Sequence, residues 1–200
     1  MNFAFIYQTA LLFLMLMDPF GNLPVFMATL RNVPPQRLSR VIFRELCFAL
    51  GAMLLALLVG QAFFGLLHIQ AGTLSIAGGL ILFLTGIKMV FSSLSEDTQA
   101  PTDEPFIVPL AIPLICGPGL IAILSTLRGS VEQATLPNCL LAILLAWSIQ
   151  TGIMLCGRPL SKILGSRGLN ALESLMGLLL TCLAVGMVIQ GINKTYGLGD

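Results

Sequence analysis

The sequence predicts an all-α integral membrane protein whose six transmembrane helices form two inverted three-helix repeats. Three observations lead to this fold class. The 200 residues are 56% hydrophobic and 10% charged, with a mean hydropathy of +0.96, whereas soluble domains contain about 25% charged residues. Six apolar segments are each long enough to cross a bilayer, which takes about 20 residues. The two halves of the chain also resemble each other.

The six segments form a single polytopic membrane domain. They cover approximately residues 3–30, 41–66, 71–91, 106–127, 137–156 and 172–192. Repeat one therefore occupies about residues 1–91 and repeat two about residues 106–200, and the polar loop 92–105 joins them. The N-terminus lacks the basic region of a signal peptide, so we expect the first segment to be retained as a span.

The basic residues predict how the chain is oriented. Lys and Arg are enriched in cytoplasmic loops, and most of those in this chain follow spans one, three and five. The other side has Arg128 and Lys194. Both termini are therefore predicted outside the cytoplasm, with the loop 92–105 inside. We also expect the segment between spans five and six, which includes Arg158, Lys162 and Arg167, to be a cytoplasmic loop.

The two halves match at an offset of about 98 residues. Asp18-Pro19 corresponds to Gly117-Pro118, and Thr29-Leu30-Arg31 corresponds to Thr126-Leu127-Arg128. Each half has an odd number of spans, so the second half must enter the membrane from the opposite side. Inverted repeats of this kind are common in secondary transporters.

Small residues recur along spans three and six. Span three has Gly72, Gly79 and Gly86, and span six has Gly177 and Gly191. Such stripes let helices approach closely in lipid, where packing drives association. We interpret them as packing surfaces rather than ligand contacts, serving either contacts within the chain or a homo-oligomer.

Spans one and four are both interrupted near their middles, where irregular backbone must be buried in protein or line a cavity. Asp followed by Pro is a typical helix start, so Asp18-Pro19 and, more weakly, Gly117-Pro118 can begin new helices. Asn22-Leu23-Pro24 offers a second restart, because a residue before proline disfavours helix. The residues to which we assign the breaks are Pro19, Pro24, Pro113 and Pro118.

The paired breaks predict a binding site at the bilayer midplane. In inverted repeats the two new half-helices run outward, so both N-termini point at the centre, where their dipoles favour an anion such as a carboxylate. Asp18 is the only acidic residue in span one and could hold an ammonium group, a proton or Na⁺. The competing interpretation is a proline kink with a locally satisfied carboxylate. Our candidate binding residues are Asp18, Gly21, Asn22, Gly117 and Gly119.

Other polar residues rank lower as site candidates. Arg44 and Glu45 open span two, and because adjacent helical positions do not face each other we expect no ion pair between them. Gln150 and Gln190 lie within spans, where hydrogen bonds between helices are the usual role. The five cysteines form no Cys-x-x-Cys pair and are interpreted as small buried hydrophobes.

Two stretches resemble signatures of a known family. Met-Asp-Pro-Phe-Gly-Asn-Leu-Pro-Val-Phe at 17–26 is similar to the opening signature of the MarC family, and the stretch from Glu104 into Gly117-Pro118-Gly119 is similar to its second signature. The resemblance covers nearly the whole chain. It implies a six-span protein of the bacterial inner membrane, grouped with small neutral amino acid transporters and more distantly with LysE-type exporters.

These observations favour a secondary transporter of a small neutral amino acid or related metabolite. No Walker A motif is present, so H⁺, Na⁺ or the solute's own gradient would supply the energy. We expect no cofactor, no metal site and, with a net charge of +1, no nucleic-acid partner. The alternatives are a non-transporting membrane factor and an intramembrane enzyme. The enzyme is disfavoured because no nucleophile–base pair, carboxylate pair or ligand cluster is evident.

Overall fold

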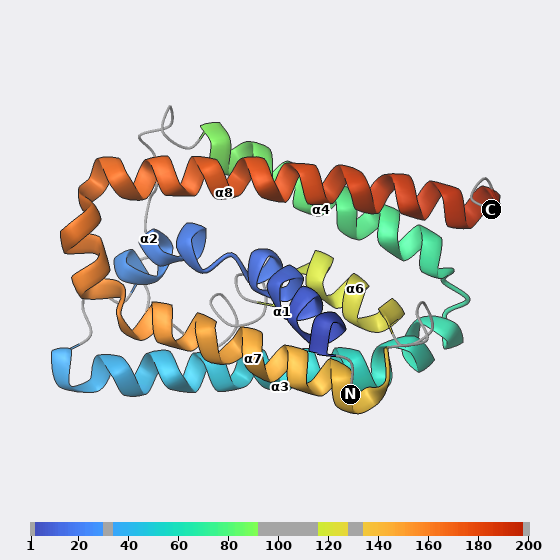
Figure 1. Cartoon of the computed structure of the whole chain (residues 1–200), viewed down its shortest axis with the longest axis horizontal. Helices are drawn as coiled ribbons and strands as arrows, with labels where there is room; N and C mark the ends of the chain where they lie inside the picture. Colours follow the sequence, from blue (N-terminus) through green and yellow to red (C-terminus); the bar gives the residue numbers. More distant parts are fainter. Residues whose placement is uncertain (1–2, 30–33, 92–115, 128–133, 198–200) are drawn as a thin grey trace.

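The computed structural model describes residues 3–29, 34–91, 116–127 and 134–197. Within these ranges every regular element is an α-helix (Figure 1). The helices are α1 (Phe3–Met17), α2 (Pro19–Thr29), α3 (Pro35–Leu66), α4 (Ala71–Phe91), α6 (Pro118–Leu127), α7 (Leu136–Leu155) and α8 (Gly157–Tyr196). The prediction of an all-α chain is confirmed for this part of the protein.

Five stretches in the described part are long and apolar enough to cross a membrane. They are Phe3–Leu23, Gln36–Leu66, Ala71–Phe91, Leu136–Leu155 and Arg167–Tyr196. The predicted fourth span, 106–127, is described only from residue 116, so Pro113 and the loop 92–105 lie outside the described residues. The number of six spans therefore stays a prediction.

The outer surfaces of these helices are apolar, as a lipid environment requires. Large hydrophobic side chains on four helices are more than half exposed, whereas a soluble protein rarely exposes a continuous apolar surface. Examples are Leu55, Phe63, Leu84 and Leu178. Cys116 and Cys139 are buried as predicted, whereas Cys47, Cys156 and Cys182 are exposed.

The helices form three layers (Figure 1). The long helices α4 and α8 pack together on one side, and α3 packs with α7 on the other. The shorter α1, α2 and α6 lie between these pairs, α1 against α7, α2 against α8, and α6 against both α3 and α4. The helices α1 and α2 on either side of the first break, and α6, are thus at the centre of the fold.

Glycines account for the close contact between α4 and α8. A Cβ atom at Gly86 would lie 2.7 Å from the carbonyl oxygen of Gly177, and one at Gly79 would lie 2.9 Å from that of Ala184. At the far end, a Cβ atom at Gly72 would lie 2.9 Å from the carbonyl oxygen of Gly191. Real side chains do not tolerate such distances, so the predicted role of the stripes in helix packing is confirmed.

Two expectations about helix boundaries are wrong. The segment after span five is helical, since α8 begins at Gly157 and includes Arg158 and Arg167. Its direction changes at Gly165, which has φ 62° and ψ 177°, a conformation that glycine adopts without steric cost. The second span also starts six residues before the predicted boundary, because Pro35 at the first helical position pre-organises α3.

Candidate functional site

The break in the first span is a single residue. Helix α1 ends at Met17 and α2 begins at Pro19, so Asp18 alone departs from helix, with φ 43°. Asp and Asn are the non-glycine residues that adopt this left-handed conformation most readily. Pro24, which we assigned to the break, instead lies within α2, so the alternative restart after Asn22 is not used.

Asp18 is buried, with 5% of its surface exposed, and it caps α2. Its Oδ1 accepts a hydrogen bond from the backbone N–H of Gly21 at 3.1 Å, the third residue of the helix, as an N-cap carboxylate does. The cap at Asp18-Pro19 is therefore as the sequence predicts. One carboxylate oxygen is satisfied locally, which the kink interpretation also requires.

Asn22 connects the two sides of the break. Its side-chain Nδ2 donates to the carbonyl oxygen of Met17, the last residue of α1, at 2.8 Å. Its backbone N–H donates to the carbonyl oxygen of Asp18 at 3.1 Å. Asn22 thus satisfies a carbonyl group that the end of α1 leaves without an intrahelical partner.

Two other elements, α4 and α8, lie against this break. A Cβ atom at Gly21 would collide with the Asp18 carboxylate and with the terminal methyl group of Met89 on α4. On α8, the Glu173 carboxylate lies close enough to Asp18 to repel it electrostatically. No motif in the sequence connects two carboxylates 155 positions apart, so the neighbourhood of Glu173 could not be predicted from the sequence.

The predicted second break is described only from Cys116 onward, where two non-helical residues precede α6. Cys116 is buried and Gly117 precedes the first helical residue, Pro118. The carbonyl oxygen of Gly117 accepts the first hydrogen bond of α6, from the N–H of Ile121 at 3.1 Å. A Cβ atom at Gly119 would collide with Leu82 on α4. Glycine at this position therefore lets α6 start directly against α4.

Both breaks face α4 from the centre of the molecule. Gly21 meets Met89 and Gly119 meets Leu82, and seven residues of helix separate these contacts by about 10 Å. From there α2 and α6 extend toward opposite ends of the fold (Figure 1). The predicted site residues Asp18, Gly21 and Asn22 are thus together, while Gly117 and Gly119 lie one to two helical turns away along α4.

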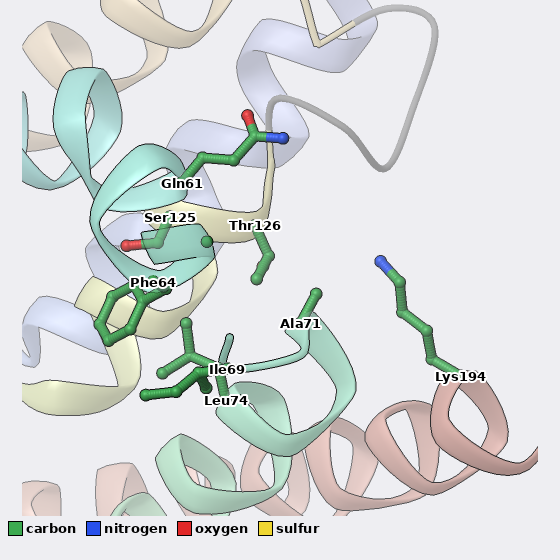
Figure 2. Close-up of a pocket in the computed structure, with 9 residues that line it drawn as sticks. Gln61, Phe64, Ile69, Ala71, Leu74, Ser125, Thr126 and Lys194 are labelled. Atoms are coloured by element: carbon green, nitrogen blue, oxygen red, sulfur yellow. The ribbon is translucent and has the colours of Figure 1, made fainter. Parts of the chain in front are cut away.

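Residues of α6 line two cavities. One of about 300 Å³ is mainly apolar, between α1, α6 and α8, and reaches from Leu12 and Ile123 to Gln190. The other, of about 250 Å³, lies near the C-terminal end of α6, where Lys194 and Gln61 extend from opposite sides (Figure 2). Ser125 and Thr126 of α6 also line it. Neither cavity is lined by Asp18 or Gly117.

The expectation that Arg44 and Glu45 do not pair is wrong. Both Nε and a terminal nitrogen of Arg44 donate to Oε1 of Glu45, at 3.2 and 2.9 Å. The rule that adjacent helical positions do not face each other describes only the directions of the Cβ atoms. The Arg44 side chain is long enough to bend round the helix and reach Glu45. Gln150 also differs from its prediction, because neither of its side-chain polar atoms has a hydrogen-bond partner among the described residues.

Comparison with known proteins identifies close relatives. The profile of the "MarC family integral membrane protein" family matches residues 3–196. The UPF0056 inner membrane protein YhgN of Escherichia coli K12 is 42% identical over 190 residues, covering 94% of this chain and 96% of its own. UPF0056 membrane proteins of Buchnera aphidicola (Baizongia pistaciae) and Chlamydia pneumoniae are 40% and 36% identical, covering at least 95% of each chain. No solved structure matches the chain.

Proposed function

The chain belongs to the MarC family of integral membrane proteins, and from this premise we propose that it is a secondary transporter. The solute is a small molecule, in first place a neutral amino acid, and the membrane is the bacterial inner membrane. The relatives named above are described only as UPF0056 membrane proteins. The proposal therefore rests on the architecture of this chain.

The observation that carries the proposal is the pair of helix starts at the centre of the fold. The N-terminus of a helix carries roughly half a positive charge and free N–H groups, which suit the carboxylate of an amino acid. Beside one of these starts, Asp18 and Glu173 supply negative charge, which suits an ammonium group. Together the breaks offer both charges of a small zwitterion.

Contacts between α4 and α8 support the inverted repeat that alternating access requires. The sequence offset of 98 residues relates Gly79 to Gly177 and Gly86 to Ala184. If the two repeats are equivalent, a contact between Gly86 and Gly177 implies a second contact between their counterparts, Ala184 and Gly79. Both contacts are present. In this proposal residues 106–115 complete a sixth span that corresponds to α1.

Alternating access then consists of movement of one repeat against the other around the breaks. The cavities beside α6 and α8 both lie toward the N-terminal end of α4, and in this proposal they are parts of the solute path on that side of the central site. An H⁺ or Na⁺ gradient, or the gradient of the solute, supplies the energy. Both termini lie outside the cytoplasm, in accordance with the distribution of basic residues.

The competing function is a non-transporting membrane factor in which Asp18 is only a helix cap. The hydrogen bond from Gly21 to Asp18 is the observation that favours it. An intramembrane enzyme has less support, because among the described residues no group of three His, Cys, Asp or Glu side chains could hold a metal ion. The two functions differ for Asp18→Asn, which keeps the cap and removes the charge. A transporter should lose uptake in this variant, whereas a protein in which Asp18 is only a cap should be unaffected.

Uptake into liposomes tests the proposal. Purified protein is reconstituted, and entry of radiolabelled glycine, alanine and serine is measured with and without H⁺ and Na⁺ gradients. We expect saturable uptake that falls about tenfold or more in Asp18→Asn, equivalent to losing one charged contact of about 1.4 kcal/mol. Gly117→Leu, which fills the second break, should have a similar effect.

Gly152→Ala on α7 is the matched control, because a Cβ atom at Gly152 meets no other atom within 4 Å and Gly152 lines neither cavity. Its uptake should equal that of the wild type. Wild-type uptake no greater than in empty liposomes, for all three solutes and in both orientations, would contradict transport of these amino acids. Undiminished uptake by Asp18→Asn would instead remove the proposed role of the Asp18 charge.

A further inference from the structure

Exposed arginines gather at the end of the molecule that is opposite both termini. The start of α3 and the bend between α7 and the long part of α8 lie at this end (Figure 1). Arg37 and Arg40 are exposed in the first two turns of α3, and Arg158 and Arg167 are exposed before and after the bend. The predicted orientation of the chain places this end on the cytoplasmic side.

Residues 157–164, the first part of α8, form a short helical segment that crosses the end of the bundle. This surface segment leads from the layer of α7 to the layer of α4 and the long part of α8 (Figure 1), and the non-helical Gly165 ends it. Helix α7 before it has 20 residues and is about 30 Å long, which is the thickness of the hydrocarbon core. The surface segment therefore lies at the membrane surface and along it.

The surface segment has a basic side and an apolar side. Positions 158 and 162, an arginine and a lysine, are four residues apart and so share one side of the helix. Leu160 packs against the buried core and holds the segment on the bundle. Ile163, in contrast, is 83% exposed. Basic residues beside an exposed apolar side chain are typical of helices that lie between the headgroups and the acyl chains of a bilayer.

The four exposed arginines have no acidic partner among the described residues. Within these ranges the one ion pair joins Arg44 to Glu45. The sequence has no acidic residue between Glu132 and Glu173, and α3 has none in its first turn. The acidic loop 92–105 lies outside the described residues. A guanidinium group binds phosphate oxygens through two parallel hydrogen bonds, so these arginines suit the phosphate layer of a membrane.

We propose that this end of the protein binds anionic phospholipids, with the surface segment at the centre of the binding surface. The arginines bind the phosphate groups, and Ile163 contacts the acyl chains below them. A free phosphate ion would satisfy the arginines alone, whereas a phospholipid satisfies both. The enrichment of basic residues in cytoplasmic segments accounts for the orientation of the chain. The surface segment adds a preference for one class of headgroup, and this preference does not depend on the proposed transport.

Lipid-dependent unfolding tests the inference. The purified full-length protein in a neutral detergent is titrated with phosphatidylglycerol, phosphatidylcholine or inorganic phosphate, and the thermal unfolding midpoint is recorded at each concentration. A ligand that binds only the folded state raises this midpoint. We expect a saturable rise with phosphatidylglycerol and no change with the other two. The affinity for phosphatidylglycerol should fall about fivefold for each arginine removed, and hence about 25-fold in the double variant Arg158→Gln/Arg167→Gln.

Lys194→Gln is the matched control, because it removes a positive charge at the opposite end of α8. Its affinity for phosphatidylglycerol should equal that of the wild type. Raising NaCl from about 0.1 M to about 1 M shortens the Debye length from about 10 Å to about 3 Å and should abolish the rise in the wild type. This measurement tests the charges without any substitution.

Four results would overturn the inference. The first is a wild-type midpoint that phosphatidylglycerol does not raise, as expected if the acidic loop 92–105 neutralises the arginines. The second is an equal rise with phosphatidylcholine, and the third is an equal rise with inorganic phosphate. The fourth is a double variant that keeps the wild-type affinity for phosphatidylglycerol. None of these measurements involves uptake, so a failed transport proposal would leave the result unchanged.

Discussion

At the scale of single residues, Asp18 combines two demands that few side chains meet. Its backbone has φ 43°, and its carboxylate caps α2 through Gly21. The cap at Asp18-Pro19 could be predicted because the two residues have strong local preferences. The proximity of Glu173 could not, because it depends on how α8 packs against α2.

Replacing Asp18 separates its structural role from its charge. Asp18→Asn keeps an oxygen for the Gly21 N–H and tolerates the positive φ, so we expect a thermal unfolding midpoint close to that of the wild type. Asp18→Ala loses the cap and should be destabilised by about 1–2 kcal/mol. Thermal unfolding of the purified protein in detergent measures both.

Thr135→Ala is the control for a cap change. Thr135 is the residue before α7, and its side chain makes no cap hydrogen bond. Its replacement should change the free energy of unfolding by less than about 0.5 kcal/mol, as surface changes usually do. An Asp18→Ala protein with the same thermal unfolding midpoint as the wild type would show that the cap does not stabilise the break.

At the scale of helices, sequence patterns predicted packing better than boundaries. The glycine stripes of α4 and α8 were predicted correctly because small residues at regular spacings have one common consequence in lipid. The helical character of residues 157–164 was missed, because a cluster of basic residues was interpreted as a loop. Pro24 was misplaced because a proline shortly after a helix start was interpreted as a second start, whereas α2 continues through it to Thr29.

Two glycine substitutions test the packing of α4 against α8. Both Gly→Ala changes gain about 1 kcal/mol of helix propensity. At Gly86 the added Cβ would lie 2.7 Å from the Gly177 carbonyl oxygen, on backbone that cannot move aside, whereas at Gly186 it meets open space. We expect Gly86→Ala to lower the unfolding midpoint, with overpacking costing about 1–3 kcal/mol, and Gly186→Ala to maintain or raise it. Equal gains in both variants would contradict the close contact.

At the scale of the whole molecule, the central claim is that the two breaks form one site that opens to each face in turn. Composition was sufficient to predict a polytopic membrane protein, because lipid imposes one rule on every span. The common position of both breaks against α4 was predicted only as a shared depth in the membrane. The contacts of Gly21 with Met89 and of Gly119 with Leu82 show in addition that both helix starts lie against the same helix, α4.

Cys116 provides the most direct measurement, because it lies buried beside Gly117 at the second break. A variant that keeps only this cysteine is placed in vesicles of known orientation, and a charged, membrane-impermeant thiosulfonate reagent is added to either side. Our account predicts that Cys116 is modified from both sides. A variant that keeps only Cys139, buried on α7, should stay unmodified. Modification of Cys116 from one side only, or from neither, would contradict alternating access at the breaks.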